Sequence, residues 1–574
     1  MWKCKQHETN QKFFAGSPAF IAITLLVAAV IINPFREMCT LDDSFSYARM
    51  VQHLLATGHY RIDEWAAANM PVQIYLAAAL SKVFGYSLSL LRCSTLLLLS
   101  VALVSFHHLL RELGHSRAVA SILTLAIPAS PLILMLAFTF MSDVQFLGWL
   151  ILALLLYFQG IRNRSAAHIF LGSLAASCAI GTRQFGIAII GGFVIAWLWP
   201  SRDRPPVRLL LLGIMLPVLA AATQIHAGLA APNITQSLRI AETRAFLRLP
   251  VRTIVKELIW RCAVISQYVG MAFLPLAPLV LRIRRGLWSR HVFRIPLWLL
   301  GLFACAGMLG GLAIASHLSA RPEAWNRGLA TPLQMYWFLP TKLFPLPHVM
   351  WFLDIGGIVG GTLLIALCFK ALQDAKPSLR IPSEKIFLAG TGIALLLLHL
   401  VYRQLNDTYI TALTPFGLLL FGEFIRGVAL SRSLVRVCTC VSLIFILATA
   451  FWMRGEYAFR QAIWNSADDV FRTGVPPLDI SAVCWADYHG SFDAWVAAGA
   501  PGYDDWQHYV DPLHGPYLAW LQSQWDRAQY RVMESRSLTA PPGWSLITSR
   551  SDRSAGFSRW FVLTLKRDPA SMPQ

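Results

Sequence analysis

Charged side chains are scarce in this sequence, and acidic ones are the scarcer kind. Of its 574 residues only 14% are charged, with 30 Asp and Glu against 49 Lys and Arg, whereas 56% are hydrophobic. Apolar runs long enough to cross a bilayer recur through roughly the first four-fifths of the chain. This composition excludes an ordinary water-soluble protein and predicts a polytopic α-helical membrane protein.

Several motifs that identify other protein classes are missing. The ten cysteines show no metal-site spacing, and no glycine-rich nucleotide loop is present. No internal repeat of fixed period is found, which disfavours a repeat-built transporter. The first apolar run, residues 18–34, has no small-residue cleavage site before Asn33-Pro34, so we expect it to act as a signal anchor.

The net charge of +19 is carried largely by short connectors between apolar runs. This distribution is typical of the positive-inside rule, so we predict no nucleic-acid partner. Alternation of the connectors predicts about 13 spans, an N-terminus in the cytoplasm and a C-terminus outside the cytoplasmic (inner) membrane. The expected spans are residues 18–34, 88–110, 118–136, 144–160, 166–180, 185–199, 209–227, 263–281, 295–316, 349–369, 386–402, 410–425 and 437–451.

The composition changes near the end of the last expected span. Residues 1–452 are predicted to form the transmembrane domain and residues 453–574 a small α/β extracytoplasmic domain. Within that domain the short apolar runs 480–483 and 561–565 predict strands.

Unusual polar residues gather at outer span ends in this topology. They are Asp42, Asp43, Asp143, Arg183, Asp407 and Tyr409. Because ionisable groups are costly to place in lipid, such residues are candidates for a functional site. Singly, each could be an ordinary span terminus or a side chain that snorkels to head groups, but their common side favours one shared outward-facing site.

The first outer segment is predicted to carry two interfacial helices. Apolar residues recur at helical spacing over 45–55, and a second helix is expected over 65–84, broken near Pro71. Either Asp42 or Asp43 can act as the N-cap of the first helix while the other is free for chemistry. Helices of this kind suit a substrate that has one end in lipid.

A second outer segment carries four basic residues spaced by four, Arg244, Arg248, Arg252 and Lys256. On a helix they would form a basic stripe, with a kink expected at Pro250. The stripe could contact the head groups of membrane lipids or the phosphate of a lipid-linked substrate.

The order of these motifs resembles the bacterial GT-C glycosyltransferases, in particular the family 39 and aminoarabinose-transferase-like group. The resemblance rests on Asp-Asp after the first span, Met-Ser-Asp at 141–143, Thr-Arg-Gln at 182–184 and the element from Tyr409 to Pro415. It implies transfer of a sugar from a polyprenyl-phosphate donor to a lipid, polysaccharide or protein acceptor on the outer face. Asp42-Asp43 and Asp143 match the two loop acids of the family, whereas many relatives carry Asp-Arg-Tyr where this chain has Asp-Thr-Tyr at 407–409. Trp485, Asp487 and Tyr488 resemble an aromatic-acid element of relatives, with a purely structural core as the other interpretation.

The residue types suit this chemistry independently of the resemblance. Asp42 or Asp43 could accept the proton of the acceptor hydroxyl, while Asp143 orients that hydroxyl, the base or a divalent metal ion. Arg183 and the basic stripe would hold the phosphate. No cofactor is identified by a motif. The rival functions are a transporter or flippase for lipid-linked sugars, whose polar groups should line both halves of the membrane, and an accessory scaffold with replaceable acids.

Overall fold

The computed structural model describes residues 18–39, 42–200, 205–230, 233–280, 282, 356–365, 367–368, 381–402, 407–426, 430–482, 484–501, 514–535, 537–552 and 560–568. Most of these residues are helical, and a small sheet lies near the C-terminus. The expected span 295–316 lies outside the described residues, and the expected span 349–369 is described only in part.

The chain is a helical membrane protein. The described helices that are long and apolar enough to cross a bilayer are α4 (Leu88–Glu112), α7 (Ser142–Arg162), α10 (Val207–Ala230), α16 (Ser383–Val401) and α19 (Arg432–Phe471). These five become up to seven if each of two bent helix pairs forms one span. Shorter apolar helices are α1 (Pro18–Ile32), α8 (Ala166–Thr182), α9 (Ile187–Leu198) and α18 (Thr414–Phe424). The count of about 13 spans therefore stays a prediction.

Two expected spans differ from single straight helices. Residues 118–136 fold as α5 (Arg117–Ala126) and α6 (Pro131–Ala137), which meet at 75°. Pro128 and Pro131 explain the break, because proline cannot donate the backbone hydrogen bond that continues a helix. Likewise α12 (Val251–Met271) is followed by a 55° bend instead of continuing straight to residue 281.

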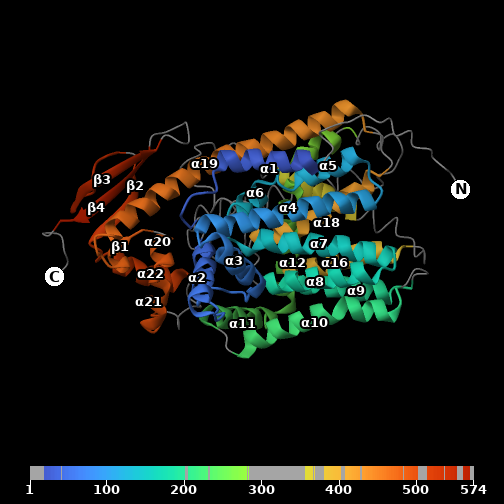
Figure 1. The fold of residues 1–574 in the computed structure, drawn as a ribbon, viewed down its shortest axis with the longest axis horizontal. Helices are drawn as coiled ribbons and strands as arrows, with labels where there is room; N and C mark the ends of the chain where they lie inside the picture. The colour runs from blue at the N-terminus through green and yellow to red at the C-terminus, as the bar shows by residue number, and fades with distance from the viewer. Residues whose placement is uncertain are drawn as a thin grey trace.

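The last long helix extends well beyond the membrane-spanning run that the sequence predicts. α19 continues to Phe471 without interruption, so the expected division between residues 452 and 453 falls inside it. In Figure 1 this helix runs along the helical bundle and reaches the C-terminal sheet at the opposite end. It therefore connects the bundle to the C-terminal elements by one continuous helix.

Helices form at both places where interfacial helices are predicted, with different bounds. α2 covers Asp42–Thr57, and α3 covers Pro71–Phe84, so the second helix begins at Pro71. Proline is favoured at the first position of a helix, which explains this start. A further helix, α11 (Ile234–Leu247), begins at an Asn233 capping box.

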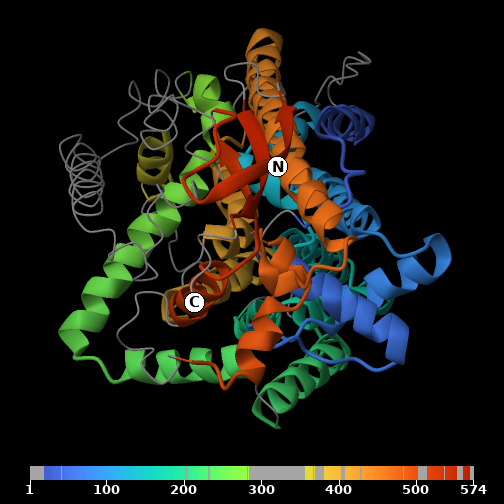
Figure 2. The same cartoon turned by 90° about the vertical axis from the view of Figure 1, so that its left-hand side faces the viewer.

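The C-terminal part combines short helices with a four-stranded sheet of order β1-β2-β4-β3. Its strands are β1 (Ile480–Ser481), β2 (Tyr530–Ser535), β3 (Trp544–Asp552) and β4 (Trp560–Arg567), which confirms the two predicted strands. β1 pairs parallel with β2, and the other pairs are antiparallel. Figures 1 and 2 show these elements gathered at one end of the bundle, beside α2. Trp485, Phe492 and Tyr517 belong to the same buried core as the membrane helices.

Candidate functional site

Asp43 lies in the first turn of α2 and is held by a side chain from the following loop. The Trp65 indole N–H donates a hydrogen bond of 2.7 Å to Asp43 Oδ1. The Tyr47 hydroxyl, one helical turn further along α2, lies 3.5 Å from Asp43 Oδ2. These contacts fix the carboxylate while leaving it partly exposed. The side chain of Asp42 lies outside the described part of the structure.

Asp143 and Arg183 form a buried ion pair. Asp143 occupies the first turn of α7, Arg183 caps the C-terminus of α8, and Asp143 Oδ1 lies 3.1 Å from an Arg183 Nη. The exposed fractions of the two side chains are 1% and 8%. Arg183 Nε also donates to Ser142 Oγ at 2.8 Å. A buried charge of this kind is stable only beside its partner, so the two residues act as one unit.

An aromatic layer covers the arginine on another side. The Arg183 guanidinium lies over the Tyr409 ring at 4.3 Å, a cation–π contact. Phe185 stacks on His399 at 4.5 Å and lies within 5.8 Å of Tyr409. Tyr409 belongs to the short helix α17 (Asp407–Ile410), in which the side chain of Asp407 is not among the described ones.

Tyr47 contacts Asp43 and interacts electrostatically with the buried ion pair and with Tyr409. Burial raises the pKa of the Tyr47 hydroxyl, and the nearby Asp43 raises it further, while Arg183 acts in the opposite direction. Tyr409 and Asp143 also act on this hydroxyl. The structure therefore brings together four predicted site residues from four separate segments, and Tyr47 remains protonated among them as a hydrogen-bond donor.

The basic stripe does not join this group within the described part of the chain. Its four residues lie on α11, on the following turn and on α12, because the helix expected across Pro250 is broken there. All four side chains are exposed, and none forms an ion pair or a hydrogen bond with a described site residue. The cations closer to the site are Arg239, which acts electrostatically on Tyr409, and Arg261, which donates to the carbonyl of Tyr402.

Two residues that touch Asp43 were not predicted. Tyr47 follows Asp43 by four positions, so the shared helix face was a signal available in the sequence. Trp65 lies 22 positions from Asp43, in a loop that folds back over the helix start, and no local pattern indicates this contact. Trp485, by contrast, is fully buried, in agreement with the structural interpretation of that element.

No group of three or more His, Cys, Asp or Glu side chains among the described residues is arranged to hold a metal ion. The described side chains of the site are carboxylates, an arginine and aromatic hydroxyls.

No family model matches the sequence, and no curated protein matches it. Among solved structures, ArnT from Cupriavidus metallidurans bound to undecaprenyl phosphate is 15% identical, covers 97% of this chain and 100% of that chain, and has a TM-score of 0.42. Arabinosyltransferase EmbB from Mycobacterium smegmatis is 14% identical over 86% of this chain and 44% of its own, with a TM-score of 0.33. The apo oligosaccharyltransferase of Archaeoglobus fulgidus is 15% identical over 70% of this chain and 57% of its own, with a TM-score of 0.27. All three TM-scores are low, so the roles of individual residues rest on the geometry of this chain.

Proposed function

We propose that this chain is a membrane glycosyltransferase. It transfers a sugar from a polyprenyl-phosphate donor to a lipid, polysaccharide or protein acceptor at the outer face of the cytoplasmic membrane, with its N-terminus in the cytoplasm and its C-terminal domain outside. Undecaprenyl phosphate, bound in the ArnT structure, belongs to the class of lipid that would carry this donor sugar. The observation that carries the proposal is the buried Asp143–Arg183 pair with Tyr409 against the guanidinium, electrostatically coupled to Tyr47, which contacts Asp43.

The reaction assigns a role to each group. The acceptor hydroxyl oxygen bonds to the anomeric carbon of the sugar while the bond from that carbon to the phosphate oxygen breaks. The hydroxyl proton passes to a carboxylate, for which Asp43 is our candidate because it is partly exposed, and the bonding electrons leave with the polyprenyl phosphate.

Arg183 stabilises the negative charge that develops on the leaving phosphate. Its Nε is used by Ser142 and one Nη by Asp143, but a guanidinium has five N–H donors and can serve more than two partners. Asp143 orients this guanidinium. The exposed stripe of Arg244, Arg248, Arg252 and Lys256 would attract lipid phosphates to the same face of the membrane.

A transporter or flippase for lipid-linked sugars is the alternative. Its polar groups should line the pathway near mid-membrane. In this chain the acids instead occupy the first turns of α2 and α7, and α2 lies at the end of the bundle that carries the C-terminal elements (Figure 1). This placement favours chemistry at one surface over passage through the membrane.

The proposal is tested with Asp43→Asn and Asp143→Asn made singly in cells. We expect product formation to fall by about 10²–10⁴-fold for Asp43→Asn, because it removes a general base. Mass analysis of lipid-linked sugars and envelope glycans should show an accumulating donor and an under-glycosylated acceptor. Asp469→Asn is the matched control, because Asp469 pairs with Arg550 on the exposed surface of the C-terminal part. Undiminished product in both test variants would refute the assignment.

A further inference from the structure

The residue that orients Asp43 is itself held by the C-terminal part of the chain. We call three short helices the C-terminal cap: α20 (Trp485–Tyr488), α21 (Ser491–Ala497) and α22 (His514–Trp525). The Trp65 ring lies edge-on to Phe492 of α21 at 4.9 Å and to Tyr517 of α22 at 5.8 Å. A further ring, Phe45 at 5.5 Å, belongs to α2. Trp65 is only 5% exposed, so the cap supplies part of the wall that fixes its indole.

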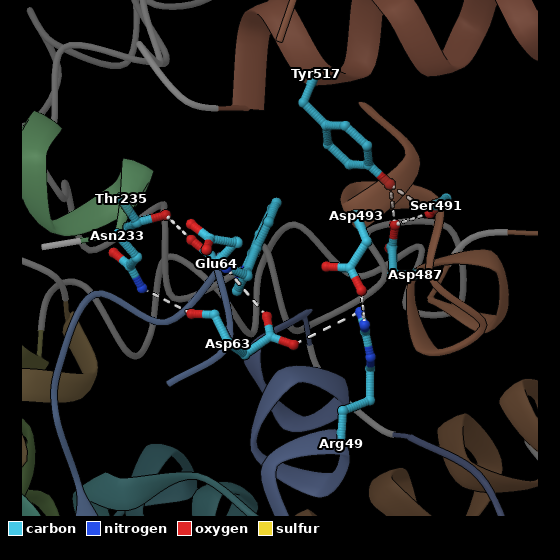
Figure 3. Close-up of polar contacts among 10 residues, drawn as sticks. Arg49, Asp63, Glu64, Asn233, Thr235, Asp487, Ser491, Asp493 and Tyr517 are labelled. Carbon is cyan, nitrogen blue, oxygen red and sulfur yellow. Dashed lines mark hydrogen bonds and ion pairs between the residues drawn. The ribbon is translucent and has the colours of Figure 1, made fainter. Parts of the chain in front are cut away.

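Polar contacts tie the cap to α2 beside this aromatic group. Arg49 of α2 lies between two carboxylates, Asp493 of α21, to which it donates a hydrogen bond, and Asp63 of the loop that carries Trp65, at 3.6 Å (Figure 3). One turn further along α2, the Gln52 side-chain amide donates to the Tyr488 hydroxyl at 2.6 Å. Arg49 therefore connects its own helix, α2, both to the cap through Asp493 and to the Trp65 loop through Asp63.

Hydrogen bonds hold the helices of the cap to one another and to α19. The Tyr517 hydroxyl donates to Asp487, and Ser491 Oγ donates to the same carboxylate at 2.9 Å (Figure 3). Burial, together with Asp487, raises the pKa of Tyr517, so this hydroxyl keeps its proton and remains a donor. The Trp485 indole donates to Asp468 of α19 at 2.6 Å, which anchors the cap to the long helix.

The same loop is held on its other side by the start of α11. The Asn233 side-chain amide donates to the carbonyls of Asp63 and Ala66 at 2.7 and 2.9 Å. Thr235 donates to the carbonyl of Glu64 at 2.7 Å (Figure 3). Because these bonds from the start of α11 hold the backbone of the Trp65 loop, the contacts with the cap act mainly on the Trp65 side chain.

We propose that the C-terminal cap is a positioning element for catalysis, and that Phe492 and Asp493 act on Asp43 through Trp65. This inference rests on the proposed function, in which Asp43 is the base. A hydrogen bond to a carboxylate favours its charged form, which is the form that accepts a proton. The cap keeps the indole N–H directed at Asp43 and so keeps the base ionised and oriented, although no cap residue touches the reacting atoms.

The environment of Asp43 determines how this can be measured. Tyr47 from α2 and Trp65 from the loop face its carboxylate directly, and Tyr409 from α17 acts on it electrostatically. Arg183 and Asp143 lie around Tyr47. Loss of the indole N–H removes one hydrogen-bond donor to Asp43 and leaves the Tyr47 hydroxyl in place, so it should move the acid limb of the pH–rate profile without abolishing activity.

The experiment measures kcat/KM against pH for the purified full-length protein in lipid bicelles. The probe is the polyprenyl-phosphate-sugar fraction from membranes of the source cells, and released polyprenyl phosphate is quantified. Trp65→Phe should shift the acid limb upward by about one pH unit and lower kcat more than it changes KM. Phe492→Leu and the surface change Asp493→Asn should shift the limb in the same direction by a smaller amount.

The controls separate positioning from general damage. Phe471→Leu removes a ring of α19 that packs on Trp485 of the cap and on His489, which follows α20, and that is not among the rings described against Trp65. Asp469→Asn breaks a comparably exposed ion pair. Both should leave the limb in place. If Trp65→Phe shifts the limb but Phe492→Leu and Asp493→Asn do not, the cap has no positioning role. If Asp43→Asn retains full activity, the proposed function fails instead, whatever the cap variants do.

Discussion

The Asp143 carboxylate lies 3.1 Å from the Arg183 guanidinium because α7 begins where α8 ends. The two helices pack side by side, so the first turn of one and the C-cap of the other meet at the same end. Both side chains are nearly inaccessible to solvent, and neither charge has water to stabilise it. Each therefore depends on the other.

Removal of one partner should cost far more than removal of both. Arg183→Met or Asp143→Leu alone leaves a buried uncompensated charge, for which we expect a loss of about 3–5 kcal/mol in the free energy of unfolding. The double variant should lose much less. Denaturant unfolding in detergent micelles measures all four proteins, and additive losses would contradict the pairing.

The sequence predicted much of this site because helix ends in a membrane protein alternate between two faces. That rule placed Asp43, Asp143, Arg183 and Tyr409 on one side, and the structure brings them together. It could not locate Trp65, whose contact depends on how a loop of irregular structure folds back. Nor could it separate exposed from buried cations, so the exposed stripe was favoured over Arg239 and Arg261.

The sequence also predicted most of the helices and strands, but not how some of them bend or extend. Hydropathy identifies long apolar segments, and short apolar runs in a polar region predict strands, which is why the helices and the two strands were expected. The 75° angle between α5 and α6 depends on packing around a proline-containing break, and the continuation of α19 to Phe471 depends on its contacts with the C-terminal sheet. Neither feature is local, so neither could be derived from a window of sequence.

Glu37 should stabilise the start of α4. Its carboxylate accepts hydrogen bonds from the backbone N–H groups of Leu88 and Ser89 at 2.8 and 3.2 Å. These donors have no partner within the helix, and a negative charge there also favours the helix dipole. Glu37→Ala should therefore lower the free energy of unfolding by about 1–2 kcal/mol. Glu384→Ala, in the first turn of α16, is a control without such a contact among the described residues and should cost less.

Substitution by alanine should affect stability differently at two neighbouring glycines on α9, Gly191 and Gly192. A Cβ on Gly192 would overlap Thr391 Oγ1 and lie 2.6 Å from the Thr391 backbone nitrogen, because α9 and α16 pack closely through small residues. A Cβ on Gly191 would approach only the Ala394 methyl, at 3.3 Å. Gly192→Ala should destabilise by about 1–3 kcal/mol. Gly191→Ala should be close to neutral in the same unfolding assay, and an equally small effect of Gly192→Ala would show that the helices can separate without cost.

His489 should make the attachment of the C-terminal cap sensitive to acid. Its ring packs 4.1 Å from Trp485 and 4.9 Å from Phe471, and burial lowers its pKa, with Asp468 opposing and Arg49 adding to the shift. The folded state therefore favours the neutral ring. Its stabilising contribution is complete above the ordinary histidine pKa of about 6.5 and is lost as pH falls below that value, because the unfolded chain then binds the proton more readily.

We expect the unfolding midpoint of the wild-type protein to drop between pH 7.5 and pH 5.5, and His489→Phe to reduce that drop, since phenylalanine keeps the ring packing and cannot be protonated. His59→Phe, at an exposed position after α2, should leave the pH dependence unchanged. Protease sensitivity of the cap at the two pH values provides a second measurement. If His489→Phe loses as much stability as the wild type on acidification, other groups govern the acid response and the half-buried His489 imidazole does not.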